Sequence, residues 1–192
     1  MSELVLEPIR TALVVIDLQR GIVAREVAPH TSRDVIERSA QLARALRAAG
    51  GRVVLVRVAW AADEADRLRT PIDAALPPGP TPADWADLVP ELAGEGDLVI
   101  TKHQWGAFYG TELELQLRRR GITTLVMCGI STNFGVESTA RDGWERGFAI
   151  VFVEDAMASF SAEAHAFSIA TIFPRIGRVR KTAEVREALA RS

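Results

Sequence analysis

The feature that most constrains this chain is a regular alternation of short apolar runs with longer segments of helical spacing. The expected strands are Thr11–Asp17, Arg52–Val58, Asp97–Thr101, Thr123–Cys128, Phe148–Val153 and a short one at Val179. The expected helices are Arg33–Ala49, Thr111–Arg120, Asn133–Arg146, Glu163–Phe173 and Ala183–Ala190. Near-continuous apolar strands that alternate with helices are typical of a parallel sheet covered on both faces. The pattern therefore predicts an α/β fold, with three α/β/α layers around a mostly parallel sheet.

Length and charge limit the class of protein. A chain of 192 residues is close to the size of one domain, so we expect a single domain over 1–192. The formal net charge of −2 disfavours a general nucleic-acid binder or a basic membrane-surface protein. The longest apolar runs have strand length, far short of the roughly 20 residues that a membrane span needs. The N-terminus lacks the pattern of a secretion signal. We expect a soluble, cytoplasmic protein.

No cofactor or metal motif is found in the sequence. The histidines, His30, His103 and His165, are far apart and match no metal-ligand spacing. The single cysteine, Cys128, excludes an intrachain disulfide and a cysteine-built metal site. Neither the dinucleotide fingerprint nor the phosphate-binding loop occurs, and the G-x-S-x-G nucleophile elbow is absent too. The sequence predicts no metal and no cofactor, and a small molecule as the substrate.

Two charged residues follow predicted strands at the edge where open α/β sheets bind ligands. Asp17 ends the first strand and Lys102 follows the third. A carboxylate at this position is partly desolvated, which raises its pKa, whereas a nearby lysine lowers it. Together the two residues form a candidate acid/base pair. The alternatives are an aspartate that caps a loop and a solvated lysine.

Other residues near the strand ends are candidates for substrate binding. The backbone of Gly129–Gly135 leads into a helix, and free N–H groups at such a turn hold an oxyanion or a carboxylate. An ordinary turn capped by Thr132 or Asn133 is the alternative. Aromatic side chains near strand ends suit a small organic substrate, although each alone has packing as its alternative. The candidates are Gln19, Trp60, Trp105, Phe108, Ile130, Ser131, Phe134 and Gly135.

Three sequence blocks carry a family resemblance. They are VVIDLQ with Asp17, ITKHQWGAFYGTELELQLRRRGI with Lys102, and CGISTNFGVESTARDGW. In order and spacing, over about Thr11 to Arg180, the chain resembles the isochorismatase-like hydrolase superfamily, within an uncharacterised bacterial subgroup. The resemblance implies a six-stranded sheet of order 3-2-1-4-5-6 and a homo-oligomer, a dimer or higher. It also implies a cis peptide at Ile130–Ser131.

The chain departs from the family pattern at one position. Amidase branches carry an Asp-Lys-Cys triad, and aligning the third block puts the cysteine position at Gly135. Cys128 lies seven residues earlier, inside a predicted strand, where we expect an inert core thiol. The resemblance therefore implies a member without a cysteine nucleophile. The histidines of the nicotinamidase metal cluster are also missing from RVAWAADEADRLR.

The resulting hypothesis is a hydrolase of a small carboxylated metabolite, with neither a metal nor a cysteine nucleophile. Family members named for isochorismate hydrolysis cleave a vinyl ether and release pyruvate. Here Asp17 would donate a proton or activate water, and Lys102 would be its partner. Three alternatives stay open: a catalytically lapsed member that binds a metabolite or a protein, an amide hydrolase with a different nucleophile, and hydrolysis through Ser131 or Thr132.

Overall fold

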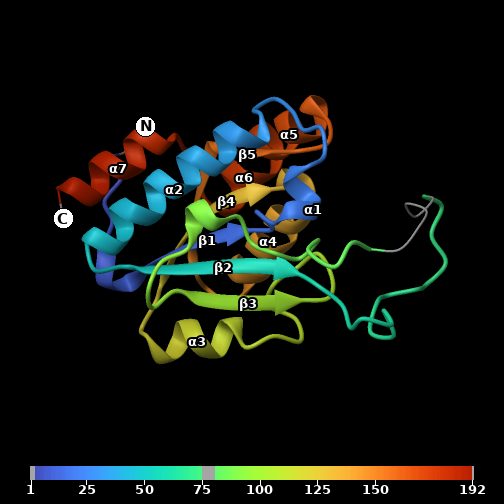
Figure 1. The fold of residues 1–192 in the computed structure, drawn as a ribbon. Coiled ribbons are helices and arrows are strands. Elements are labelled where there is room, and N and C mark those ends of the chain that lie inside the picture. The colour runs from blue at the N-terminus through green and yellow to red at the C-terminus, as the bar shows by residue number, and fades with distance from the viewer. Residues whose placement is uncertain (1–2, 75–80, 192) are drawn as a thin grey trace.

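A computed structural model describes residues 3–74 and 81–191 and contains one six-stranded sheet (Figure 1). The strand order is β3-β2-β1-β4-β5-β6, and every neighbouring pair is parallel. The strands are β1 (Thr11–Ile16), β2 (Arg52–Val58), β3 (Leu98–Lys102), β4 (Thr124–Ile130), β5 (Ala149–Ala158) and β6 (Arg178–Arg180). The predicted fold class and the strand order that the family resemblance implies are confirmed.

Helices cover both faces of the sheet. On one face lie α2 (Ser32–Ala48) and α7 (Thr182–Ala190), which also contact each other. On the other face lie α3 (Leu113–Arg119), α4 (Glu137–Glu145) and α6 (Phe173–Ile176). The remaining segments are α1 (Arg20–Val23), α5 (Ala162–Phe167), the 3₁₀ turns η1 (Pro8–Arg10) and η2 (Pro90–Leu92), and the π turns η3 (Thr132–Val136) and η4 (Ser168–Ile172). Within the described residues, no helix is long and apolar enough to cross a membrane.

Alternate residues of the central strands build two cores. In β1, Leu13 and Val15 pack toward α2 and α7, whereas Val14 and Ile16 pack toward α3 and α4. All six residues of β1 are buried, because successive side chains point to opposite faces and both faces are covered. This double burial is why the strands are continuous apolar runs rather than alternating ones.

The fifth strand is longer than the sequence predicts. The predicted strand ends at Val153, but β5 continues to Ala158 after an irregularity in its pairing with β4. Met127 pairs with Phe152, yet Gly129 pairs with Met157, so β5 has extra residues at this point. Glu154 and Asp155 therefore lie inside the strand, in a bulge, rather than beyond its end. The sequence predicted the end of the strand at the first polar residues after the apolar run. That prediction was wrong, because a bulge removes such polar residues from the strand pairing without ending the strand.

Several helix boundaries also differ from the predicted ones. The helix predicted over Asn133–Arg146 starts with the π turn η3 before α4 begins. The helix predicted over Glu163–Phe173 is divided among α5, η4 and α6. The proline-rich stretch over 71–90 has residues 75–80 outside the described part of the chain. Around Trp85 the chain forms a hydrogen-bonded turn over 83–86, where a proline-rich segment with a short helical turn is the prediction from the sequence.

Gly129 allows β1 and β4 to approach each other closely at the edge where Asp17 emerges. Its φ is +116°, a conformation that favours glycine. A Cβ atom at this position would lie 2.2 Å from the carbonyl oxygen of Ile16. The absence of a side chain is therefore required by both the backbone conformation and the packing.

We predict that Gly129→Ala lowers the free energy of unfolding by at least about 3 kcal/mol. The alanine would have both an unfavourable positive φ and a clash between its Cβ and the backbone of Ile16. Gly50→Ala is a matched control, because Gly50 also has a positive φ of +84° but no atom within 4 Å of the added Cβ. The control should cost only about 1–2 kcal/mol. Urea denaturation measures both values, and equal losses for the two variants would contradict the packing argument.

Candidate active site

Asp17 lies at the switch point of the sheet, where β1 has β2 on one side and β4 on the other. It is the first residue after β1, and its φ of +51° is in the left-handed region. Its backbone N–H donates to the carbonyl oxygen of Val56 at 2.9 Å, and its own carbonyl accepts from the N–H of Gln19 at 2.8 Å. The chain thus turns sharply at the strand end, which is where open α/β sheets bind ligands.

Lys102 reaches Asp17 from the end of β3. Its Nζ donates to Oδ2 of Asp17 at 2.8 Å and to the carbonyl oxygen of Gln104 at 3.0 Å. Because β2 lies between β3 and β1, the lysine side chain has to extend past the end of β2. The two side chains are 2% and 8% exposed, so this is a buried ion pair. The structure brings together the two residues that the sequence singled out as catalytic.

Burial raises the pKa of Asp17 to about 6, although the charge and the hydrogen bond of Lys102 oppose the shift. A carboxyl group with a pKa near the working pH can both donate and accept a proton. Its Oδ1 atom is buried and has no hydrogen-bond partner among the described residues. Since buried polar atoms are almost always paired, Oδ1 is free for a ligand or a water molecule.

The loop after β4 faces the carboxyl group of Asp17. The peptide bond Ile130–Ser131 is cis, as the family resemblance implies. A Cβ atom at Gly135 would lie 3.1 Å from Oδ2 of Asp17, 2.8 Å from Cγ2 of Ile16 and 3.6 Å from the carbonyl oxygen of Trp105. Position 135 is therefore directly beside the acid, and the glycine leaves space there.

A hydroxyl network holds the start of this loop. The Ser131 hydroxyl donates to Oδ1 of Asn133 at 2.9 Å and lies 3.2 Å from the Ser159 hydroxyl. Ser159 also donates to Asn133. The sequence analysis missed Ser159, because it took the fifth strand to end six residues earlier. Ser131 thus has hydroxyl and amide partners, none of which is a base that would activate it.

Thr132, unlike Ser131, contacts a histidine, which the sequence analysis did not predict. Its hydroxyl hydrogen-bonds Nδ1 of His165 at 2.8 Å, although the sequence placed no histidine near it. Thr132 is fully buried, and its hydroxyl is already engaged with His165. Burial lowers the pKa of His165, which favours the neutral imidazole. The contact with Thr132 joins the loop to α5.

A cluster of aromatic side chains lies next to the loop that contains Gly135. Trp105 is 62% exposed and packs edge-on against Phe134, with ring centroids 4.7 Å apart. Phe134 in turn contacts Phe160, and the Arg25 guanidinium lies 3.7 Å above the Phe160 ring. The sequence analysis singled out Trp105 and Phe134. It missed Phe160 for the same reason as Ser159, and it missed Arg25 because α1 was not predicted.

Two of the other predicted substrate-binding residues lie in the hydrophobic cores. Phe108 packs against Phe148 in the core beneath α4. Ile130 is fully buried in the core on the α2 face. Both side chains are therefore packed in the cores of the structure.

The remaining two predicted binding residues form contacts around the end of β2. The buried Gln19 side chain donates to the carbonyl oxygen of Val58 at 2.9 Å and accepts from its N–H at 2.8 Å. Trp60 stacks on Trp85, with centroids 5.3 Å apart, and donates to the carbonyl oxygen of His103 at 3.1 Å. These bonds fix the loops after β1, β2 and β3 relative to one another.

Cys128 is buried in β4 and packs in the core on the α2 face. Its Sγ accepts a hydrogen bond from the Ser39 hydroxyl at 3.4 Å. Burial raises the pKa of the thiol to about 12, so it stays protonated at neutral pH. Since the thiolate is the nucleophilic form, this environment is that of an inert core cysteine.

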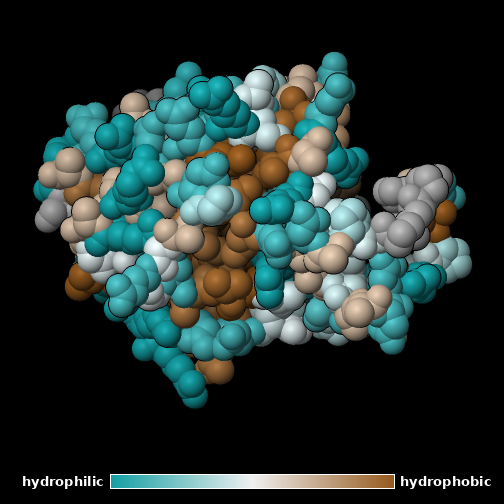
Figure 2. Space-filling view, viewed as in Figure 1, coloured by the Kyte–Doolittle hydropathy of each residue, from teal (hydrophilic) through white to brown (hydrophobic). Residues whose placement is uncertain are grey.

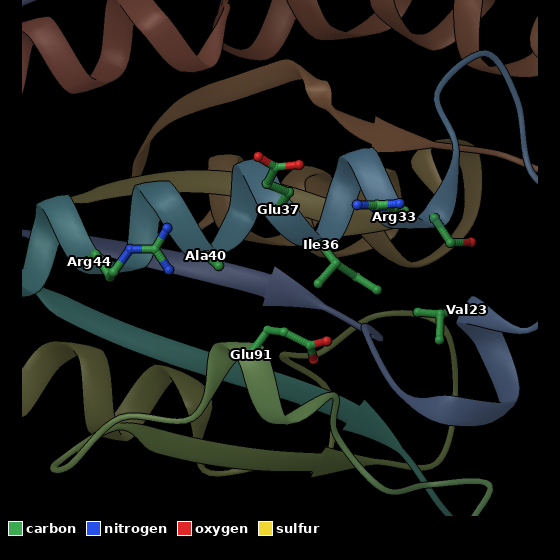
Figure 3. Close-up of a pocket in the computed structure, with 8 residues that line it drawn as sticks. Val23, Arg33, Ile36, Glu37, Ala40, Arg44 and Glu91 are labelled. Atoms are coloured by element: carbon green, nitrogen blue, oxygen red, sulfur yellow. The ribbon is translucent and has the colours of Figure 1, made fainter.

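A separate surface hollow lies between α2, α1 and η2. In Figure 2 this face of the molecule has a hydrophobic area near its middle. The hollow has a volume of ≈ 520 Å³, and Figure 3 shows an apolar floor with charged residues around it. Its lining consists of Val23, Ser32, Arg33, Ile36, Glu37, Ala40, Arg44 and Glu91. None of the predicted catalytic or substrate-binding residues is among them.

Residues 11–184 match the Isochorismatase domain family. The chain belongs to the isochorismatase family. It is 55% identical over 180 residues to the uncharacterised isochorismatase family protein YecD of Escherichia coli O157:H7, covering 93% of this chain and 96% of that protein. An isochorismatase family protein from Burkholderia thailandensis superposes with a TM-score of 0.94 at 43% identity, covering 98% of this chain and all of that chain.

A more distant relative carries a stated activity. The chain is 36% identical over 172 residues to the ureidoacrylate amidohydrolase RutB of Methylorubrum extorquens, covering 76% of this chain and 68% of that protein. The chain is therefore an isochorismatase-like hydrolase. Its buried Asp17 and Lys102 lie at the carboxyl edge of the sheet.

The raised pKa of Asp17 predicts how stability depends on pH. The folded chain keeps the proton up to pH about 6, whereas the group in the unfolded chain releases it near 3.8. The folded state therefore binds more protons in this window, and its stability decreases as the pH rises from about 4 to about 6. We predict that, relative to Asp17→Asn, the free energy of unfolding falls by about 2 kcal/mol between pH 4 and pH 7.

Urea denaturation of both proteins at pH 4, 5, 6 and 7 measures this difference. Because the two proteins share every other titrating side chain, subtracting the two curves isolates the contribution of the Asp17–Lys102 pair. A difference that does not change with pH, or one that grows in the opposite direction, would contradict the raised pKa.

Proposed function

We propose that this chain hydrolyses a small carboxylated metabolite by direct attack of water, with Asp17 as the proton donor. The observation that carries the proposal is the buried Asp17–Lys102 pair, in which the pKa of Asp17 is raised to about 6 and one carboxyl oxygen has no partner. A proton donor of this kind suits the cleavage of a vinyl ether that releases pyruvate.

The reaction divides into three steps. Asp17 transfers its proton to the terminal carbon of the enol ether, and the adjacent carbon becomes an oxocarbenium centre. Water adds to that centre and returns a proton to the Asp17 carboxylate. The hemiketal then collapses to pyruvate and the alcohol. The pair itself is not a metal-ligand set, because the ammonium of Lys102 occupies the position of a cation beside the carboxylate.

Lys102 controls the acidity of Asp17 in this scheme. An ammonium group has three donors, and two are used by Asp17 and Gln104 among the described contacts. The third is available for the carboxylate of the substrate. Binding a carboxylate partly neutralises Lys102, which removes the interaction that lowers the pKa of Asp17. The substrate thereby promotes the protonated, active form of the acid.

Catalysis in this proposal uses no cysteine nucleophile. Position 135, beside Oδ2 of Asp17, is a glycine and supplies no nucleophile. The one thiol, Cys128, is buried in the core with a pKa near 12. The space at Gly135 is available to water or to part of the substrate. N–H groups at the start of the Ser131–Gly135 segment, and the aromatic side chains of Trp105 and Phe134, would hold that substrate, whereas the N–H of Phe134 already donates to the carbonyl oxygen of Ser131.

Amide hydrolysis is the second candidate, and the 36% identity to a ureidoacrylate amidohydrolase favours it. In that case the ionised Asp17 would act as a base that activates water, and Lys102 would polarise the leaving group. The two candidates differ in the protonation state that they require of Asp17. The pH dependence of the rate therefore separates them.

The first test is pyruvate release from isochorismate by the purified protein. We predict turnover that falls by about 10²–10⁴-fold in Asp17→Asn, which is the usual contribution of a general acid. His103→Ala is a control that removes a partly exposed side chain next to Lys102 and should keep most of the activity. Full turnover in Asp17→Asn would refute the role of Asp17.

Absence of pyruvate from the unmodified protein would refute isochorismate as the substrate. Ureidoacrylate, assayed for ammonia release, then tests the amide candidate. A thermal shift with carboxylated ligands but no product would instead favour the catalytically lapsed binding protein.

The second test is the pH profile of kcat/KM. We predict that kcat/KM decreases as the pH rises above about 6, because the acid must be protonated in the free enzyme. In Lys102→Met the decrease should begin at a higher pH, since removing the ammonium raises the pKa of Asp17 further. A rate that instead increases through pH 6 would identify Asp17 as a base and favour amide hydrolysis.

The homo-oligomer, the cytoplasmic location and the small-molecule partner stay predictions of the sequence.

A further inference from the structure

Three metal-ligating side chains from distant parts of the sequence meet on the α5 side of the molecule. His30 comes from the loop before α2, Glu154 from the bulge in β5 and His165 from α5. Each offers one ligand atom, and these atoms all lie within 4.8 Å of one another. The two imidazole rings are edge-on, with centroids 6.0 Å apart.

Two ring nitrogens of this cluster, one from each histidine, lack hydrogen-bond partners among the described residues. His165 is 3% exposed, its Nδ1 is bonded to Thr132, and its Nε2 has no partner among the described residues. Nε2 of His30 also has no hydrogen bond there and lies 3.5 Å from Oε1 of Glu154. Since buried polar atoms are almost always satisfied, two such nitrogens beside one carboxylate need an explanation.

An ion pair between His30 and Glu154 explains only part of this arrangement. It would engage one imidazole with the carboxylate, and Nε2 of His165 would still be buried without a partner. A cation bound by all three side chains satisfies both nitrogens and the carboxylate at once.

We propose that His30, Glu154 and His165 form a binding site for a divalent transition metal, with Zn²⁺ the best match. Two imidazoles and one carboxylate are a common ligand set for zinc, and nitrogen ligands disfavour Mg²⁺ and Ca²⁺. Tetrahedral zinc with bonds of about 2.0–2.1 Å holds its ligand atoms about 3.3 Å apart. The ligand atoms therefore close by at most about 1.5 Å on binding, and a water molecule or another ligand takes the fourth position.

The backbone already holds two of the ligands close to each other. Ala28, two residues before His30, and Ser159, which follows β5, exchange two backbone hydrogen bonds of 2.7 and 2.8 Å. The loop that carries His30 is thus fastened beside β5 without the metal. Little chain ordering remains for metal binding to supply, so the site is largely preorganised.

Thr132 orients His165 through Nδ1, the ring nitrogen that does not bind the proposed metal. A metal-ligating histidine usually hydrogen-bonds through its other ring nitrogen, which fixes its tautomer and orientation, and the contact with Thr132 supplies that bond. Because Thr132 belongs to the loop that also carries Ser131 and Gly135, a bound metal would fasten this loop to β5 and α5. The metal site is thus linked to the candidate active site through one positioning residue.

The test is a titration of the EDTA-treated, full-length protein with Zn²⁺ alone, followed by isothermal calorimetry. We expect one Zn²⁺ per chain, with an affinity at least 10-fold lower in His30→Ala and in Glu154→Gln. His103→Ala is the matched control and should bind like the unmodified protein, because His103 lies outside the cluster. We expect Thr132→Val to bind 10–100-fold more weakly, the usual cost of losing a supporting bond.

A second measurement reports the ligands directly. Co²⁺ should give the visible absorption of a four-coordinate site in the unmodified protein and in His103→Ala, but not in Glu154→Gln. Far-UV circular dichroism identifies variants that have not folded, and Glu154→Gln, on a half-buried side chain, preserves shape and volume. Undetectable Zn²⁺ binding, or equal binding by Glu154→Gln and the unmodified protein, would overturn the proposal. Neither result depends on pyruvate release, so the metal site and the hydrolase proposal fail separately.

Discussion

The buried ion pair between Asp17 and Lys102 is the interaction on which the candidate site depends. Removing two charges from water is costly, and the mutual attraction offsets that cost only where the geometry is good. Here the pKa of Asp17 is raised to about 6, so burial outweighs the lysine. A pair kept merely for stability would be replaceable by apolar side chains. Its placement at the switch point of the sheet is that of a ligand site.

The rest of the sheet serves to bring this pair together. Lys102 and Asp17 are 85 residues apart and come from strands that are not neighbours. The parallel order places both strand ends at one edge, and Gly129 lets β4 approach β1 so closely that the following loop lies against the carboxylate. Gln19 holds the end of β2, past which the lysine side chain has to reach.

The loop that contains Ser131, Thr132 and Gly135 connects two different chemical environments. Gly135 faces the proton-transfer pair, and Thr132 contacts His165 of the proposed metal cluster. Ser131 is held by Asn133 and Ser159 between these two contacts. Such a loop is restrained on both sides, which is what a site with narrow geometric tolerance requires.

The sequence by itself determined the fold class, the strand order through its family resemblance, and the pair Asp17 and Lys102. These follow from local signals, because a doubly buried strand is a continuous apolar run and a charged residue that follows it marks the strand end.

The tertiary structure alone decided which distant residues meet. The bulge in β5 moved the strand end from Val153 to Ala158, and no local pattern identified Ser159 or Phe160 as neighbours of the loop. His30 and His165 match no sequence spacing, yet the fold places them within reach of one carboxylate. Side chains that meet through chain folding have no periodicity in the sequence, so only the packed structure shows them.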